Sequence, residues 1–379
     1  MTTIVTVIKH ACICTGETII ADGYIRFAKT ILAVGPMTDF QPLANEKVIW
    51  GQGKIIVPGF IDVHSHGGYG IDAMNATPNE LIKMIQLMAK NEGITSYFCT
   101  TMTQSVDQIS HAMQTIATAA QHTPLIQGIH LEGPFIAPKF KGAQPAAAII
   151  APDPTLVANW QKQANGLIKL ITYAPEITGA TALETFCLQQ GITLSIGHSA
   201  ATRAQLKNSA ATHVTHLYNA QSLAVHREPG VMGHALLEPN LTVELIMDGF
   251  HNAPDMVDLA YRLKGATRIE LITDSMRAKG LGDGKSELGG QAVTVSGNEA
   301  RLADGTIAGS VLRFDDAFRN SMRFTSATLL DAVKMASVNQ ATEFGLSQKG
   351  SLAAGKDADL NILSADYQLQ ATYCLGQAI

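Results

Sequence analysis

Residues 57–68 read V-P-G-F-I-D-V-H-S-H-G-G, an apolar run that stops abruptly at two histidines and two glycines. A short apolar run bounded by such residues is typical of a buried β-strand. Successive side chains of a strand alternate between its faces, so His64 and His66 point the same way where this strand ends. The stretch therefore predicts a strand that aims two imidazoles at one metal ion.

Seven further apolar runs follow before residue 275, and each also ends in polar or ionisable residues. Those endings are 100–102, 130–132, 173–176, 197–199, 216–219, 248–251 and 273–275. Amphipathic segments at 78–91, 106–121, 181–190 and 202–209 lie between runs, and 314–323 and 328–343 also look helical. Strand and helix repeated eight times predicts a (β/α)8 TIM-type barrel, whose active site lies where the strands end.

The two ends of the chain have a different texture. Residues 1–56 and 344–379 alternate apolar and polar residues around turn formers, which is typical of short strands. We expect both ends to build one small β-sandwich domain, with residues 57–343 forming the barrel. Glycine-rich residues 280–310 contain turn formers at 296–298 and 304–305, and predict a β-hairpin inserted over the barrel mouth.

Composition excludes several classes of protein. The net charge is -5 and the 379 residues contain no run of Lys or Arg, which argues against a nucleic-acid binder. No segment approaches the roughly 20 apolar residues of a membrane helix, and the first residues lack a signal-peptide pattern. We expect no membrane contact and a cytoplasmic location. The five cysteines are scattered, as buried free thiols would be.

Candidate metal ligands lie at four of the eight strand ends, and a lone carboxylate, Asp274, lies at a fifth. The four ends carry His64 and His66, Glu132, His198, and His216. Any one of them alone is more often a core residue than a ligand, but a shared position at the strand ends favours one site. Imidazoles with a carboxylate suit Zn²⁺ or Fe²⁺. A metal-activated water would be the nucleophile and Asp274 the general acid/base.

Two other histidines occur near these ends. His213 precedes His216 by three residues and faces the other way on a strand, so we interpret it as packing. His130 shares a face with Glu132, and either orients a ligand or belongs to the core.

Several motifs in order resemble a known family. They are H-L-E-G-P-F at 130–135, G-H-S at 197–199, H-L-Y-N-A at 216–220, R-E-P-G at 227–230, D-G-F-H at 248–251 and T-D-S at 273–275. Together with G-S-L-A-A-G-K-D-A-D-L at 350–360, they are similar to those of the N-acetylglucosamine-6-phosphate deacetylases, in the amidohydrolase superfamily. The resemblance runs almost the full length of the chain.

The resemblance implies an activity: hydrolysis of the acetamide of N-acetylglucosamine 6-phosphate to acetate and glucosamine 6-phosphate. It implies that Glu132, His198 and His216 hold the primary metal ion and that Asp274 is the acid/base. Some members lack the His64–His66 pair and use one metal ion, so its presence here predicts room for a second ion, bridged by Glu132. The expected cofactor is one or two Zn²⁺ or Fe²⁺ ions per chain.

Substrate contacts and assembly are implied in the same way. Residues expected to bind the sugar phosphate are Ala143, Gln144, Asn219, Ala220, Arg227, His251, Ile307, Ala308 and Gly309. Some members carry a histidine that polarises the acetyl carbonyl in the loop where this chain has Gln144, which donates a hydrogen bond without charge. Arg227 suits a phosphate because its planar fork binds two oxygens at once. We expect a homodimer, with phosphate contacts that cross its interface.

Three alternatives stay open. The N-acetylgalactosamine 6-phosphate enzyme is barely distinguished by sequence. An amidohydrolase acting on a cyclic amide or nucleobase is disfavoured because the end of the fourth strand, T-Y-A-P-E at 172–176, offers no lysine to carboxylate. A non-catalytic scaffold on the same barrel is disfavoured because every expected ligand is present. Arg277 and Lys279, after Asp274, are expected either to tune the pocket or to be solvated.

Overall fold

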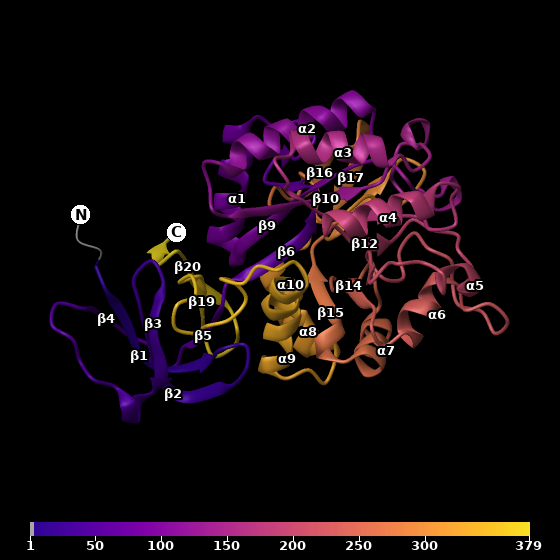
Figure 1. Ribbon diagram of the computed structural model, residues 1–379. Coiled ribbons are helices and arrows are strands. Elements are labelled where there is room, and N and C mark those ends of the chain that lie inside the picture. The colour runs from indigo at the N-terminus through magenta and orange to yellow at the C-terminus, as the bar shows by residue number, and fades with distance from the viewer. Residues whose placement is uncertain (1–3) are drawn as a thin grey trace.

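A parallel eight-stranded sheet forms the centre of the molecule in the computed structural model, which describes residues 4–379 (Figure 1). Its strands, in chain order and with each paired to the next, are β6 (Phe60–Ser65), β9 (Ile94–Thr101), β10 (Ile126–Glu132), β11 (Ile168–Tyr173), β12 (Thr193–Ile196), β13 (His213–Val214), β14 (Thr242–Ile246) and β15 (Ile269–Ile272).

The sheet closes on itself where its first and last strands end. The backbone N–H of Asp274 donates to the carbonyl of His64 at 2.8 Å, and the N–H of His66 donates to the carbonyl of Ser275 at 2.8 Å. Both links lie at the C-terminal ends of the strands. The expected (β/α)8 TIM-type barrel is confirmed, and its closure brings the first and last candidate ligands together.

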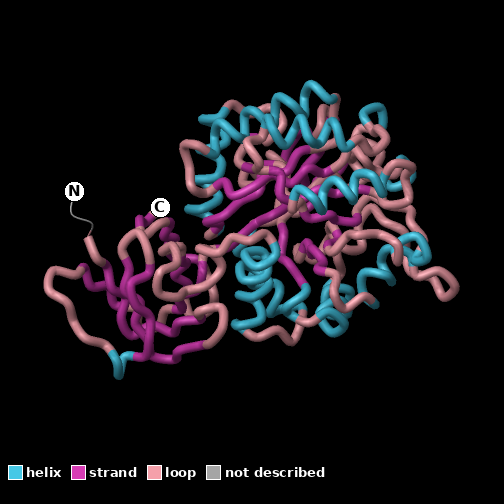
Figure 2. The backbone as a smooth tube through the Cα atoms, in the orientation of Figure 1, coloured by secondary structure: helices cyan, strands magenta, loops and turns pink. Residues whose placement is uncertain are grey.

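Helices surround the barrel strands (Figure 2). They are α1 (Pro78–Glu92), α2 (Val106–Ala120), α3 (Pro154–Gln163), α4 (Ala180–Gln190), α5 (Arg203–Leu206), α6 (Gly230–Leu237), α7 (Pro254–Lys264), α8 (Phe314–Phe324), α9 (Leu329–Val333) and α10 (Asn339–Glu343). Short 3-10 turns are η1 (Met37–Asp39), η2 (Pro138–Phe140), η3 (Ala146–Ala148) and η4 (Ala266–Arg268). Apolar residues buried between strands and helices form the main core.

Local sequence signals fix several helix ends. Thr77 accepts from the N–H of Glu80, whose side chain reaches back to Thr77, and Gly93 ends α1 with a φ of 78°. Such a capping box and a left-handed glycine are the expected stop signals of a helix. The predicted helix at 328–343 is instead α9, a π-helical turn η5 (Lys334–Val338) and α10. Asn339, directly after this turn, donates to the carbonyls of Ala266 and Ile269.

Strands from both chain ends form one mixed sheet beside the barrel (Figure 1). They are β1 (Thr6–Cys14), β2 (Ile19–Phe27), β3 (Ile31–Pro36), β4 (Lys47–Trp50), β5 (Ile55–Pro58), β19 (Leu360–Leu363), β20 (Leu369–Cys374) and β21 (Gln377–Ala378). The antiparallel pairing of β5 with β19 joins the two ends of the chain. The small β unit built from both ends is thus confirmed; the domain boundaries at 56/57 and 343/344 stay a prediction.

The inserted segment after β15 has one strand more than the predicted hairpin. It is an antiparallel sheet of β16 (Gly284–Leu288), β17 (Gln291–Ser296) and β18 (Glu299–Leu302). Gly289 and Gly290 both have positive φ and make a tight turn that the prediction overlooked. A two-stranded pair of β7 (Gly67–Gly68) and β8 (Ile71–Asp72) follows β6.

Candidate metal centre

The candidate ligands meet at the C-terminal ends of the barrel strands. His64 lies in β6 and Glu132 is the last residue of β10, while His198 and His216 follow β12 and β13. Three of the site residues have left-handed backbone conformations: φ is 46° at His198, 30° at His216 and 47° at Asp274. Residues other than glycine rarely adopt such values, and those that do cluster at functional sites.

Three donor atoms form a compact triangle at the first half of the site. Glu132 Oε1 lies 3.2 Å from His198 Nε2 and 3.2 Å from His216 Nε2, and these two nitrogens are 3.1 Å apart. Tetrahedral ligands about 2.0–2.1 Å from an ion stand about 3.3–3.4 Å from one another. The other ring nitrogen of His198, Nδ1, lies 2.9 Å from the Phe140 carbonyl, to which it donates. In the neutral imidazole Nε2 then presents a lone pair, which fits a cation.

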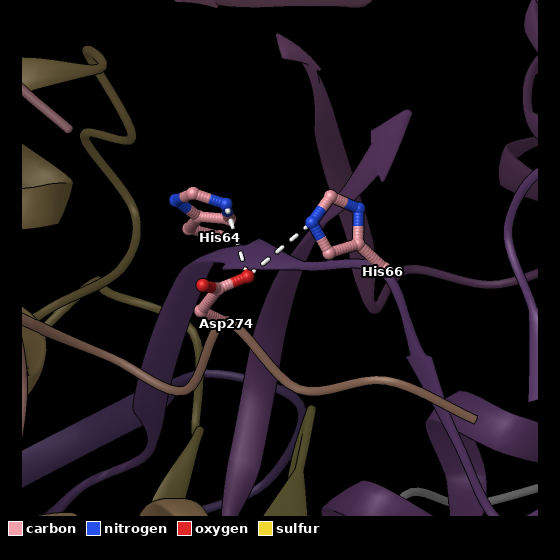
Figure 3. Close-up of side chains that lie close together, drawn as sticks. All are labelled: His64, His66 and Asp274. Atoms are coloured by element: carbon pink, nitrogen blue, oxygen red, sulfur yellow. Dashed lines mark ion pairs between the residues drawn. The ribbon is translucent and has the colours of Figure 1, made fainter. Parts of the chain in front are cut away.

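A second set of donors shares Glu132 with the first. His64 Nε2 and His66 Nε2 lie 3.4 and 3.3 Å from Asp274 Oδ1 (Figure 3). The same nitrogens lie 3.4 Å from Glu132 Oε1 and 3.3 Å from Glu132 Oε2, respectively. The geometry brings Glu132 between two donor sets, as a bridging carboxylate requires. It also makes Asp274 a candidate ligand as well as a candidate acid/base.

Electrostatics show that this cluster needs positive charge. Burial opposes ionisation of Glu132, yet His64, His198 and His216 hold the pKa of its carboxyl well below the usual value. Burial likewise raises the pKa of Asp274, but His64 and His66 outweigh that effect and the net pKa is lowered. Both carboxyls are therefore ionised at neutral pH. Two buried carboxylates among four imidazoles form a donor set that fits divalent ions, which would replace protons on the histidines.

A buried carboxylate that the sequence interpretation missed supports both halves of the site. Glu244 in β14 is fully buried, and its Oε2 accepts from His64 Nδ1 at 2.8 Å and from the backbone N–H of His216 at 3.0 Å. A carboxylate behind a metal-binding histidine fixes the ring's orientation and tautomer. The only signal in the sequence is one acidic residue inside the apolar run T-V-E-L-I at 242–246.

Gln144 contacts the candidate metal ligand Glu132. Its Nε2 donates to Glu132 Oε2 at 2.6 Å, and its Oε1 accepts from the N–H of Thr103 at 2.7 Å. The buried amide thus clamps the carboxylate that lies between the two donor sets. Gln144 also lines the cavity above the candidate ligands.

A cavity of about 230 Å³ opens above the metal centre. It is lined by the candidate ligands other than His64 and by most of the predicted substrate residues, namely Ala143, Gln144, Asn219, Ala220, His251, Ile307 and Gly309. Leu288 and Thr306, from the inserted segment, line it as well. Ala308 is buried beside them, outside the lining. Arg227 lies on an exposed loop before α6 and does not line the cavity within this chain.

His251 is oriented by its own turn. Its Nδ1 lies 2.6 Å from Asp248 Oδ2, and its backbone N–H donates to Asp248 Oδ1 at 2.7 Å. An imidazole that donates Nδ1–H to a carboxylate leaves Nε2 for a ligand. Asn219 is held by an amide contact to Asn252 Oδ1 at 3.3 Å.

Four further residues from the sequence analysis, Arg277, Lys279, His130 and His213, lie outside the lining of the cavity. Lys279 is fully buried, 3.0 Å from Glu92, so the expectation that it tunes the pocket or is solvated is wrong. Arg277 lies 3.9 Å from the buried Asp72, outside the cavity lining. His130 Nε2 contacts Thr172 Oγ1 at 2.6 Å, and its ring packs 4.5 Å from that of His64. His213 is buried as expected, among carboxylates.

Comparisons with known proteins agree with this geometry. The sequence profile of the amidohydrolase family matches residues 55–379. An N-acetylglucosamine-6-phosphate deacetylase of Bacillus subtilis is 42% identical over 97% of this chain and 96% of its own length. An N-acetylgalactosamine-6-phosphate deacetylase of Escherichia coli O157:H7 is 33% identical over 94% of this chain and 96% of its own.

A solved structure is similar throughout. It is a mutant N-acetyl-D-glucosamine-6-phosphate deacetylase of Mycobacterium smegmatis in complex with N-acetyl-D-glucosamine-6-phosphate, and it superposes with a TM-score of 0.92 at 30% identity. The match covers 100% of this chain and 99% of that one. This chain therefore belongs to the amidohydrolase family and, within it, to the N-acetylglucosamine-6-phosphate deacetylases.

Proposed function

We propose that this chain hydrolyses the acetamide of N-acetylglucosamine 6-phosphate, giving acetate and glucosamine 6-phosphate. The observation that carries the proposal is the pair of buried donor sets around Glu132, on the floor of a cavity lined by Asp274. The full-length similarity to deacetylases of this sugar phosphate supports the choice of substrate.

The residues that would hold the cofactor are Glu132, His198 and His216 for one ion, with His64, His66 and Asp274 for a second. A divalent ion bound there supplies Lewis acidity, which polarises a carbonyl oxygen and lowers the pKa of water toward 7. The donor set suits Zn²⁺ or Fe²⁺ equally, because both accept imidazole and carboxylate ligands.

Asp274 moves the proton in this scheme. Its lowered pKa keeps it a carboxylate at neutral pH, so it can accept a proton from the attacking water. As the C–O bond to the acetyl carbon forms and the C–N bond breaks, Asp274 returns that proton to the departing nitrogen. The amine leaves neutral, the acetyl group keeps the oxygen of the water as acetic acid, and its remaining proton passes to solvent to give acetate.

Other chain residues orient the substrate. The Gln144 amide holds Glu132 in place beside the acetyl group, and His251 Nε2 and Asn219 face the sugar phosphate. The inserted segment covers this region, where Gln104 donates to the Gly289 carbonyl at 2.9 Å. The insertion thereby restricts water around the reacting amide.

The cavity is incomplete for a phosphate in a single chain. No Lys or Arg is among the described residues that line it, although phosphate is bound best by such cations. Arg227 lies on an exposed loop instead. We infer that a homodimer supplies Arg227 from the partner subunit. Exposed Leu223, Val225, Leu237 and Leu263, on that loop and on the packed helices α6 and α7, offer an apolar surface for it.

An acetate-release assay tests the proposal. The purified protein, with its metal content quantified, is given N-acetylglucosamine 6-phosphate, N-acetylgalactosamine 6-phosphate and unphosphorylated N-acetylglucosamine in parallel. We expect the highest kcat/KM with the first. A higher kcat/KM with the galactosamine epimer would overturn the assigned substrate and leave the hydrolytic chemistry standing. No acetate from any of them would overturn both.

A further inference from the structure

A second cluster of ionisable side chains lies inside the barrel. This lower cluster consists of His213 in β13, Glu270 in β15 and Glu343 at the end of α10. His213 and Glu270 are 0% exposed, and one donor atom from each of the three residues lies within 4.8 Å of the others. The cluster shares no residue with the metal centre above it.

Glu270 is the member that the structure leaves unexplained. Both of its carboxylate oxygens are buried, and neither has a hydrogen-bond partner among the described residues. An unpaired buried carboxylate is strongly destabilising. Burial and the neighbouring Glu343 raise the pKa of Glu270 well above its usual value, so a bare negative charge there is unstable. A proton or a cation must supply the missing partner.

The charge count around Glu270 favours a cation. Three carboxylates, those of Glu244, Glu270 and Glu343, lie near His213, and Glu244 also pairs with His64. With Glu244 paired to His64, a fully protonated His213 offsets only one of the two remaining charges, those of Glu270 and Glu343. In a medium of low dielectric constant, the remaining like charges repel strongly.

His213 is oriented as a metal ligand would be. Its Nδ1 lies 2.8 Å from Glu343 Oε1, inside the cluster, while its Nε2 lies 3.3 Å from Glu244 Oε1, outside it. A histidine that ligates through one nitrogen commonly faces a carboxylate with the other. Glu244 Oε2 is also the acceptor for His64 Nδ1 of the upper centre. One carboxylate thus stands behind a histidine of each cluster.

We propose that the lower cluster binds a divalent transition-metal ion through Glu270, Glu343 and Nδ1 of His213. Imidazole with two carboxylates suits Zn²⁺, Fe²⁺ or Mn²⁺. The side chain of Glu343 is 16% exposed and gives the ion a path of entry. Bound there, the ion joins two barrel strands to the helix that follows the barrel, and its role is structural.

Anomalous scattering from crystals of the wild-type protein soaked in Zn²⁺ tests the site directly. We expect a peak at the zinc edge among His213, Glu270 and Glu343, separate from the peaks of the upper centre. Absence of a peak in the lower cluster overturns the proposal, whatever the upper centre shows.

Metal content provides a second, solution test. Zinc-saturated wild-type protein, freed of loose metal by gel filtration, is compared with Glu270→Gln by elemental analysis. We expect the variant to hold one equivalent less per chain, and an exposed control, Glu17→Gln, to match the wild type. Where Glu270→Gln does not fold, the partly exposed Glu343→Gln takes its place. Equal zinc in variant and wild type means that Glu270 carries a proton instead, and overturns the proposal.

Discussion

Glu132 is the residue on which the metal centre depends. Its Oε1 faces His64, His198 and His216, and its Oε2 faces His66. One carboxylate therefore connects both donor sets. The histidines of one set can still be replaced without changing those of the other.

Replacing His64 and His66 together separates one ion from two. We expect His64→Ala with His66→Ala to lower the metal content by one ion per chain, because Glu132, His198 and His216 still form a complete triangle. Elemental analysis of the purified proteins measures this, with the exposed pair His111→Ala and His122→Ala as a matched control. Unchanged metal content would refute the two-ion centre.

Glu244→Gln tests the support behind the ligands. The amide keeps the shape of the carboxylate. It loses the negative charge that orients His64, and it has one acceptor oxygen instead of two. We expect metal affinity at the upper centre to fall about 10–100-fold. Competition with a chromophoric chelator measures the affinity, and a value within twofold of wild type would show that Glu244 does not position the ligand.

For individual residues, the sequence predicts the site residues that lie at strand ends but does not predict the buried side chains that contact them. His64, Glu132 and Asp274 follow apolar runs, so barrel topology alone brings them together. Glu244 and the Lys279–Glu92 pair depend on which side chains meet across distant strands and helices. The local periodicity of the sequence carries no information on such long-range side-chain contacts.

Elements are predictable where local signals agree with tertiary packing. The amphipathic segment predicted at 78–91 is α1, and its T-P-N-E start and closing glycine are local signals that agree with its packing. The sequence predicts the two-residue strand β13 only from the polar residues that follow it. Pairing with its neighbours in the barrel stabilises this strand, and its own β-propensity contributes little. The third strand of the insertion and the π-helical turn η5 were missed, since each is fixed by contacts with the barrel or by an unrecognised glycine turn.

Helix α7 ends in a buried cation whose titration affects stability. Lys264 Nζ donates to the carbonyls of Ala235 and Glu238 at the end of α6, and burial lowers the pKa of Lys264 to about 8 from an ordinary 10.5. Between these two values the unfolded chain holds more protons than the folded one. The contribution of Lys264 to stability therefore rises as pH increases through that interval, and is constant below it.

The variant Lys264→Met removes that titration. We expect the Tm difference between wild type and variant to shift in favour of wild type from pH 7 to pH 10, as followed by circular dichroism. Lys334→Met serves as a control. A difference that stays constant or moves the other way would contradict the assigned pKa.

At the scale of the whole molecule, the cavity holds the groups for hydrolysis, but no Lys or Arg is among the described residues that line it. The barrel positions the ligands, and the insertion covers the cavity, yet Arg227 faces outward. The family resemblance implied both that Arg227 binds the phosphate and that phosphate contacts cross a dimer interface; the residues of one chain alone indicate neither. Among the described residues, no helix is long and apolar enough to cross a membrane.

Mixing two inactive variants tests assembly. We expect Arg227→Ala and Asp274→Asn each to lose activity, because one lacks the phosphate cation and the other the proton carrier. Random re-pairing of subunits should restore roughly a quarter of wild-type kcat/KM, because half of the dimers are mixed and each mixed dimer has one intact site. A mixture of Asp274→Asn with Arg262→Ala, a substitution of an exposed arginine outside the cavity lining, is the control for subunit exchange. No recovery after verified exchange would show that Arg227 does not act across the interface.

In the proposed function, Asp274 carries the proton for a hydrolysis performed at the metal centre. Acetate release from N-acetylglucosamine 6-phosphate by Asp274→Asn, with metal content measured on the same sample, tests it most directly. We expect turnover to fall by about 10²–10⁴-fold, with the ion at Glu132, His198 and His216 retained. Near-normal turnover in a sample that retains this ion would contradict it.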